Sequence, residues 1–328
     1  GVKKAAAQGL DADKPKPEET KETAKAIDQD LDNWVLRASV AKAVEAAITP
    51  RTRAIIPVHL GCAMADLDAL CALAKKHDLL LIEDCAHAHG GKWRGRGVGS
   101  YGDFGSFSFQ SSKLMTAGEG GMILCNDPEL AQRAHSHVNC GRKEPGYDDF
   151  EGLVFSGNYR ITEFQAALLS VRLKDLESER ATREENAMYL SSLLDGVEGI
   201  RPLKRLEQVS HMACYQYIFR YEPQAFGGVS RDRFVEALTA EGVPAEGDFY
   251  EPVYRSELFP VASQRFPALR ERYGERLDPA GIHCPVAEKA SYEEAVWLHH
   301  PLFMAGKEQM ERIAEAIRKI QTHADELR

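Results

Sequence analysis

The sequence predicts an α/β protein with a mostly parallel sheet in a large domain and a smaller α+β domain after it. Two observations carry this prediction. Between residues 40 and 140, short apolar segments that suit buried strands alternate with segments of helical spacing, which is typical of a parallel sheet covered by helices. The 328 residues allow about two domains. We place an atypical polar segment at 1–26, the large domain at 27–199 and the small C-terminal domain at 200–328.

Each element of the large domain follows from a local pattern. The capping box that Thr162 and Gln165 form predicts the start of a long helix that ends near Leu194. Asp127 followed by proline predicts another helix start. The remaining elements that we predict for this domain are a helix over 40–48, a buried strand over 54–60, a helix over 67–74, and strands over 79–82, 105–110 and 121–124.

The C-terminal part reads as a smaller α+β unit. An alternating segment over 215–221 predicts a strand, and the segment 230–242 predicts a helix. Apolar residues that recur at helical spacing, and so share one face, predict the last helix. That face holds Met310, Ile313, Ile317 and Ile320. We interpret His299 and His300, which precede a proline, as a loop.

Composition excludes several classes of function. A net charge of −9 disfavours non-specific binding to nucleic acid or to anionic membrane surfaces. No segment approaches the roughly 18 apolar residues of a membrane span. Seven widely spaced cysteines without a C-x-x-C pair, and no signal-peptide core, indicate a reducing compartment, so we expect a cytoplasmic protein. Residues 1–26 hold six lysines and no aromatic residue, as a solvated arm does.

The residues that carry chemistry lie between 81 and 121. Asp84 ends a predicted strand, Ser108 lies on the next strand, and Lys113 follows in a polar loop. Pyridoxal phosphate needs a lysine for its Schiff base and an acidic partner for its pyridine nitrogen. A carboxylate beside a cation shifts a pKa by about 1–3 units, which keeps the ring nitrogen protonated. Ser108 and the loop before Lys113 could supply donors for the phosphate.

Other interpretations of these residues stay open. Asp84 could cap a helix, and Asn158 and Arg160 could do the same for the helix that follows them. His87 and His89 could be satisfied interior histidines. Ser108 could alternate outward on its strand. The glycines of 118–121 lack the Lys-Ser/Thr of a nucleotide-binding loop, which favours a turn beside Lys113 over nucleotide binding.

A metal site is not expected. His59, His87 and His89 are histidines that could ligate a metal, but no clustered cysteine or carboxylate framework accompanies them in the sequence. We therefore predict that the site contains no metal.

Residues 27–328 resemble the DegT/DnrJ/EryC1/StrS family of aminotransferases, which use pyridoxal phosphate and have fold type I, the aspartate aminotransferase-like fold. The stretch from His87-Ala88-His89 to Lys113-Leu114-Met115-Thr116 is most similar to the L-glutamine:scyllo-inosose and 2-deoxy-scyllo-inosose aminotransferases of aminocyclitol antibiotic biosynthesis. The segments 249–254 and 295–298 resemble the same subgroup. Aminohydroxybenzoate synthases share some of these features.

The resemblance implies a role for each residue of the site. Lys113 would form the Schiff base and carry the proton of the 1,3-shift, with pyridoxamine phosphate as the intermediate form of the cofactor. Asp84 would pair with the pyridine nitrogen. His87 would lie against the ring or its phenolic oxygen, and Ser108 would bind the phosphate.

The resemblance also implies an assembly. The family works as a homodimer with shared active sites, and Asn158 and Arg160 match a motif that reaches the neighbouring subunit's site. Residues 1–26 lack the family's Ser-Gly-Thr turn, which holds the cofactor phosphate. We therefore expect a large domain without its usual N-terminal part.

The resemblance finally implies a reaction. The chain would move an amino group from L-glutamine, or glutamate, to a keto-cyclitol such as scyllo-inosose or 2-deoxy-scyllo-inosose. Alternatives are a nucleotide-linked keto-sugar aminotransferase, an aminohydroxybenzoate synthase, and an inactive truncated member that binds pyridoxal phosphate. Relatives that dehydrate their substrate carry histidine in place of the lysine, and Lys113 argues against that reaction.

Overall fold

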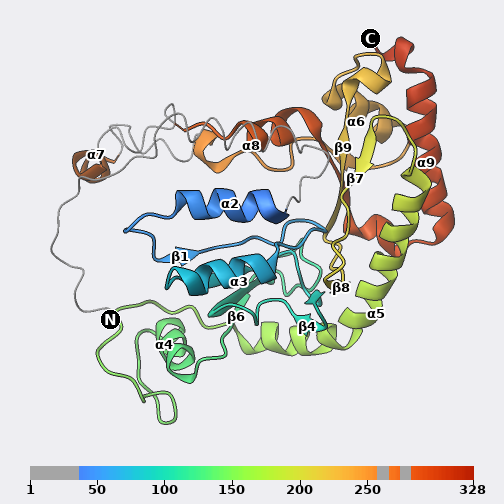
Figure 1. Cartoon of the computed structure of the whole chain (residues 1–328). Coiled ribbons are helices and arrows are strands. Elements are labelled where there is room, and N and C mark those ends of the chain that lie inside the picture. The colour runs from blue at the N-terminus through green and yellow to red at the C-terminus, as the bar shows by residue number, and fades with distance from the viewer. Residues whose placement is uncertain (1–36, 257–265, 274–281) are drawn as a thin grey trace.

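The computed structural model describes residues 37–256, 266–273 and 282–328, and Figure 1 shows the arrangement of their elements. The prediction for residues 1–26, and that for the first ten residues of 27–199, lie outside the described residues. Within the described part of the chain, no helix is both long enough and apolar enough to cross a membrane.

The first sheet holds the candidate site. Its strand order is β1-β2-β5-β6, and β6 alone runs antiparallel to its neighbour. The bounds of its strands are Ala54–Ile55 for β1, Leu80–Asp84 for β2, Phe104–Ser108 for β5 and Gly121–Leu124 for β6. Helix α3 (Leu67–Lys76) packs on β1 and β2 around a small apolar cluster, with α2 (Arg37–Ala47) beside it. Figure 1 shows β1 passing between α2 and α3 in this view.

The predicted buried strand over 54–60 is wrong in length and in burial. The strand β1 stops at Ile55, and only alternate residues up to His59 are buried, whereas Ile56 is 63% exposed. Successive side chains of an extended chain point to opposite sides, and only one side is covered here. Pro57 also has no N–H for a ladder, and Val58 keeps only an isolated bridge to Asp84.

Two helices follow the first sheet. Asp127 caps α4 (Pro128–Val138), and the predicted capping box of Thr162 and Gln165 opens α5 (Glu163–Leu194); both helix starts are confirmed. Figure 1 shows α5 running from the first sheet along the C-terminal part. Its second half is packed there, with Ala187, Leu190 and Leu194 buried, whereas Phe164 in its first turn is 90% exposed.

The C-terminal part is built on a second, antiparallel sheet of order β10-β11-β9-β7. Its strands span Ile200–Pro202 for β7, Gln216–Tyr221 for β9, Ala245–Glu246 for β10 and Ala295–His299 for β11. Helices α6 (Arg231–Ala240) and α9 (Lys307–Thr322) cover it, and the predicted apolar face of the last helix is buried. His299 ends β11, so placing this residue in a loop is wrong.

A third sheet joins the two parts of the chain. Its order is β4-β3-β8, and the bounds are Lys92–Trp93 for β3, Arg96–Gly97 for β4 and Val209–His211 for β8. Because β8 pairs with β3, the chain that follows it is brought beside the first sheet. The other elements are α7 (Pro267–Tyr273), α8 (Pro285–Lys289) and the short turns η2 (Pro223–Phe226), η3 (Val253–Arg255), η6 (Ala290–Glu294), η7 (His300–Met304) and η8 (Ala324–Leu327).

Candidate active site

Asp84 and Lys113 meet at one edge of the first sheet. Asp84 is the last residue of β2, and Lys113 follows β5 in a turn closed by its backbone N–H to the carbonyl of Gln110 at 3.0 Å. Since β2 and β5 are neighbouring parallel strands, their carboxyl ends lie together. Burial lowers the pKa of the half-buried Lys113 amine, and the negative charge of Asp84 partly offsets this.

Only one of the two carboxylate oxygens of Asp84 accepts a hydrogen bond from the described chain. Its Oδ1 accepts the backbone N–H of Ala86 at 3.0 Å, and the residues that follow form a turn, so the interpretation of Asp84 as a helix cap is wrong. No donor among the described residues lies within hydrogen-bonding distance of Oδ2. The second oxygen can therefore accept a bond from a ligand.

His87 is a buried, neutral ring in a fixed tautomer. Its Nδ1 accepts the backbone N–H of Gly61 at 3.2 Å, so Nε2 carries the proton and donates to the hydroxyl of Tyr250 at 3.2 Å. Burial, reinforced by the positive charge of Lys113, lowers the pKa of His87 to about 3. The ring stacks on Tyr215, with centroids 4.1 Å apart.

Sequence reasoning missed Tyr215. Its ring lies 4.6 Å from Lys113 Nζ, and its hydroxyl lies 2.7 Å from Ser112 Oγ. His300 Nε2 donates to the Ser112 carbonyl at 3.1 Å, and the His300 ring stacks near Tyr215 at 5.8 Å. The sequence signals Tyr215 only as the residue where the alternating 215–221 segment begins, which says nothing of Lys113.

Ser108 and His89 lie side by side. His89 Nε2 donates to the Ser108 carbonyl at 2.8 Å, which leaves Nδ1 as an acceptor with no partner among the described residues. Burial lowers the pKa of His89 to about 4 although the Ser108 carbonyl opposes it, and Lys113 adds to the lowering. The Ser108 hydroxyl accepts the N–H of Gln110 at 3.3 Å and keeps its proton to donate.

Asn158 and Arg160 lie apart from this group. Both are exposed, and Arg160 donates to the Oδ1 atoms of Asn158, at 2.9 Å, and of Asn139, at 2.8 Å. Within the described chain, no hydrogen bond links either of them to Asp84 or Lys113. The two side chains bond to each other just before α5. Their predicted contact with the active site of a partner subunit stays a prediction.

His59, Glu83 and Cys85 form a buried cluster beneath the site, with ligand atoms within 4.8 Å of one another. Glu83 accepts three backbone N–H groups of the 99–102 loop at 2.7 to 2.9 Å, and His59 Nε2 at 3.2 Å. Burial alone would raise the pKa of Glu83, but these donors lower it overall. The carboxylate thus fastens this loop to β2 through these hydrogen bonds.

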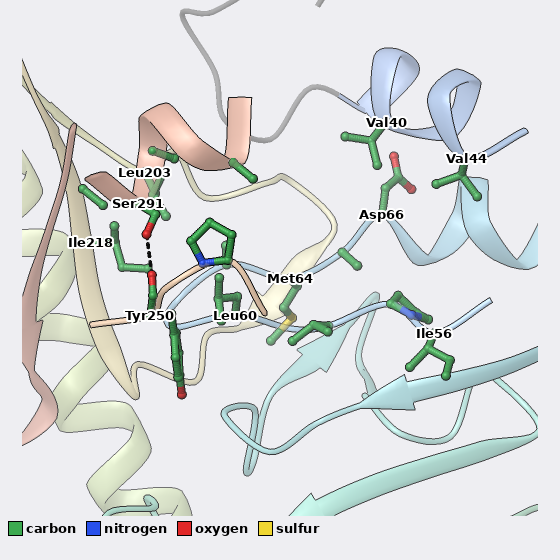
Figure 2. Close-up of a pocket in the computed structure, with 18 of the residues that line it drawn as sticks. Val40, Val44, Ile56, Leu60, Met64, Asp66, Leu203, Ile218, Tyr250 and Ser291 are labelled. Carbon is green, nitrogen blue, oxygen red and sulfur yellow. Dashed lines mark hydrogen bonds between the residues drawn. The ribbon is translucent and has the colours of Figure 1, made fainter. Parts of the chain in front are cut away.

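An apolar cavity of about 530 Å³ lies beside the candidate site, between α2 and the second sheet. Figure 2 shows Tyr250 on its wall, where the Tyr250 carbonyl accepts the hydroxyl of Ser291. Since the Tyr250 hydroxyl contacts His87, this residue links the cavity wall to the site.

The comparison with protein families decides the classification. The model of the DegT/DnrJ/EryC1/StrS aminotransferase family matches residues 20–318. The chain belongs to this family. The predicted resemblance is therefore confirmed, and the chain is an aminotransferase by descent.

Relatives within the family agree with this. The chain is 47% identical over 304 residues to a Streptoalloteichus tenebrarius protein named "Putative L-glutamine:3-amino-2,3-dideoxy-scyllo-inosose aminotransferase", covering 92% of this chain and 72% of the relative. It is 42% identical to the L-glutamine:2-deoxy-scyllo-inosose aminotransferase of the same organism, covering 87% and 69%.

Solved structures of the family share the fold. The crystal structure of 3-amino-5-hydroxybenzoic acid synthase is 32% identical, with a TM-score of 0.71 over 86% of this chain and 71% of that one. An aminotransferase from Psychrobacter cryohalolentis is 28% identical, with a TM-score of 0.72 over 87% and 72%. The predicted α/β fold of type I is thereby confirmed.

The residues of the site fit pyridoxal phosphate, the cofactor that family membership implies. Lys113 offers an amine with no hydrogen bond from the described residues, Asp84 offers a free oxygen, and His87 offers a neutral ring. The Ser108 hydroxyl can donate to a phosphate. A nucleophile, an acidic partner, a flat ring and an anion donor are the set that this cofactor needs.

Proposed function

We propose that this chain is a pyridoxal-phosphate-dependent aminotransferase that moves an amino group from L-glutamine, or glutamate, to a keto-cyclitol such as scyllo-inosose or 2-deoxy-scyllo-inosose. The observation that carries the proposal is the position of Asp84 and Lys113 after neighbouring parallel strands, where the charge of Asp84 acts on the half-buried Lys113 amine and Asp84 Oδ2 has no donor in the described chain. The substrate class rests on the names of the relatives, which are 38% to 47% identical over most of this chain.

Pyridoxal phosphate, when bound, supplies an aldehyde and a ring that withdraws electrons. The lowered pKa of Lys113 raises the uncharged fraction of its amine, which is the form that attacks an aldehyde and takes up a proton. Asp84 Oδ2 would accept a hydrogen bond from the protonated pyridine nitrogen. His87 would orient the ring by stacking, and Ser108 would donate to the phosphate.

We propose that two copies of the chain share their sites. Large apolar side chains on both sides of Asn158 and Arg160 in the sequence are exposed, and gathered exposed apolar side chains mark interaction surfaces. The exposed apolar residues of this patch are Leu153, Phe155, Tyr159, Ile161, Phe164, Leu168 and Val171. A second copy seated on the patch would bury them and bring Asn158 and Arg160 toward its own Lys113.

The 27–199 and 200–328 segments would work as large and small domains, with the site at their meeting point near Tyr215. A cytoplasmic location fits the seven cysteines, each of which is a free thiol in the structure.

Two measurements test this function. Addition of pyridoxal phosphate should produce a visible absorption band, and borohydride should then fix the cofactor on Lys113 but not on a Lys113→Ala variant. Incubation with glutamine and a panel of ketones should aminate scyllo-inosose or 2-deoxy-scyllo-inosose. A Lys113→Ala variant that still transfers the amine would refute the proposal.

The same panel decides among the alternatives. The 32% identity to 3-amino-5-hydroxybenzoic acid synthase keeps that reaction as a second candidate, and nucleotide-linked keto-sugars are a third. Formation of 3-amino-5-hydroxybenzoic acid, or amination of a nucleotide-linked keto-sugar, with no turnover of ketocyclitols, would move the chain to the corresponding class. Cofactor capture without any transfer would indicate an inactive family member.

A further inference from the structure

Tyr215 lies where the C-terminal part of the chain meets the loop of Lys113. We propose that Tyr215 positions the Lys113 amine, with its ring face holding the nitrogen and its hydroxyl fixing the loop that bears it. The significance of this role for catalysis rests on the proposed function of Lys113. The contact itself does not depend on that function.

The ring supplies the contact that locates the amine. Lys113 Nζ lies 4.6 Å from the centroid of Tyr215, within the roughly 6 Å over which an ammonium is attracted to an aromatic face. In the described chain, no hydrogen-bond acceptor and no ion-pair partner lies within bonding distance of this nitrogen. The aromatic face therefore selects one place for a side chain that has four rotatable bonds.

The hydroxyl fixes the loop. Ser112 Oγ donates its proton to Gln110 Oε1 at 2.7 Å, so the Tyr215 hydroxyl is the donor in its 2.7 Å bond to Ser112 Oγ. The Ser112 N–H also donates to Gln110 Oε1, at 2.9 Å. These bonds tie residues 110–112 to one another and to Tyr215, and Lys113 is the next residue.

Tyr215 is itself held firmly. Its side chain is buried, with the residue 2% exposed, and its backbone N–H donates to the carbonyl of Gly61 at 3.3 Å. The His87 ring stacks on it at 4.1 Å. One residue of the C-terminal part thus sets the geometry of both Lys113 and His87, which the first sheet carries.

Tyr217 provides a matched control in the same chain. It is equally buried, two residues further on, and its hydroxyl bonds to Ser191 Oγ at 2.9 Å, away from Lys113. Tyr217→Phe therefore loses a comparable buried hydrogen bond. Tyr215→Phe keeps the ring and loses the bond to Ser112, and Tyr215→Leu loses both.

The contact is measured first without cofactor. In protein with ¹³C-labelled lysine, the Lys113 signal is assigned by its disappearance in Lys113→Arg. We expect it to be shifted upfield by the ring, to stay so in Tyr215→Phe and Tyr217→Phe, and to return to an ordinary position in Tyr215→Leu. An ordinary position in the wild type, or an unchanged one in Tyr215→Leu, would overturn the proposal.

Positioning is measured second, as the rate at which Lys113 captures pyridoxal phosphate, quenched with borohydride and read by peptide mass. We expect Tyr215→Leu to slow capture by about tenfold or more, Tyr215→Phe to slow it several-fold, and Tyr217→Phe to leave it unchanged. Unchanged rates in both Tyr215 variants would refute positioning. If Tyr215→Leu does not fold, the slower capture in Tyr215→Phe alone decides.

The two failures are distinguishable. A wild-type chain that never captures the cofactor refutes the proposed function of Lys113. The lysine signal still decides in that case whether Tyr215 holds the amine. A wild-type chain that captures cofactor while all Tyr215 variants match it refutes the role of Tyr215 and leaves the proposed function standing.

Discussion

Asp84 uses its two carboxylate oxygens for different purposes. Oδ1 caps the turn after β2 through the N–H of Ala86, and Oδ2 faces no donor of the described chain. A substitution that removes the charge of Asp84 but keeps its shape can therefore separate the effect of the bond to Ala86 from the effect of a bond to a ligand. Asparagine retains an Oδ1 acceptor for Ala86 and removes the negative charge.

We predict that Asp84→Asn lowers kcat by about 10- to 1,000-fold, because the carboxylate favours the protonated pyridine by roughly 1–3 pKa units. The free energy of unfolding should change little. Steady-state transfer and urea unfolding measure the two effects. Asp127→Asn, which alters a capping aspartate on α4, is the control and should keep full activity. Wild-type turnover in Asp84→Asn would contradict the assigned role.

His87 gives the protein a pH-dependent stability. Its pKa is about 3 in the folded state, where burial is the main cause, against an ordinary value of 6.5 in the unfolded chain. Between these values the unfolded chain binds more protons. The contribution of His87 to the free energy of unfolding therefore falls as the pH drops below 6.5.

We predict that His87→Asn flattens this dependence. One proton accounts for about 1.4 kcal/mol per pH unit, so roughly 2 kcal/mol of the wild-type loss between pH 6.5 and 5 should vanish. Urea unfolding at both pH values measures it. His137→Asn, at an exposed position of α4, is the control. Equal losses in the wild type and His87→Asn would show that His87 is not the group responsible.

At the scale of elements, β2 carries two carboxylates with opposite surroundings. Asp84 faces the site, whereas the neighbouring Glu83 is fully buried on the other face, with three N–H groups of the 99–102 loop and His59 around it. Strand alternation alone sends the two side chains to opposite faces. The hydrogen bonds between Glu83 and the 99–102 loop thereby hold the end of β2, where Asp84 lies.

Glu83→Gln should lower the free energy of unfolding by about 1–3 kcal/mol, because the new amide would direct an N–H at donors that need an acceptor. Urea unfolding of the variant measures this. Glu119→Gln, in an exposed loop, is the control. A variant as stable as the wild type would mean that the loop bonds contribute no net stability.

The elements that local patterns specify were predictable from the sequence. The capping box at Thr162 confirms this, as does the apolar face of α9. The length of β1 was not predictable, because the exposure of Ile56 depends on what covers the sheet. Neither was the contact of Tyr215 with Ser112, since 103 residues separate them and the third sheet brings them together.

At the scale of the whole molecule, large apolar side chains near Asn158 and Arg160 are exposed. The folding of a single copy of the chain does not explain this exposure. Phe155 is 102% exposed and Phe164 is 90% exposed. Aromatic side chains of this kind dominate the energetics of interfaces once they are buried. We therefore place the boundary between two copies here.

We predict that Phe155→Asp combined with Phe164→Asp converts a dimer to a monomer, because two buried charges at an interface lack partners. Sedimentation equilibrium measures the mass. Met304→Asp, at an exposed position outside this patch, is the control and should leave the dimer intact. A dimer that survives the double change would place the interface elsewhere.

The proposed catalysis depends on one amine meeting one cofactor beside one carboxylate. The most direct measurement adds pyridoxal phosphate to the purified chain, reduces with borohydride and maps the added mass by peptide. We predict one modified lysine per chain, at position 113, with the label absent from Lys113→Ala. Label spread over surface lysines, or equal labelling of the Lys113→Ala variant, would contradict it.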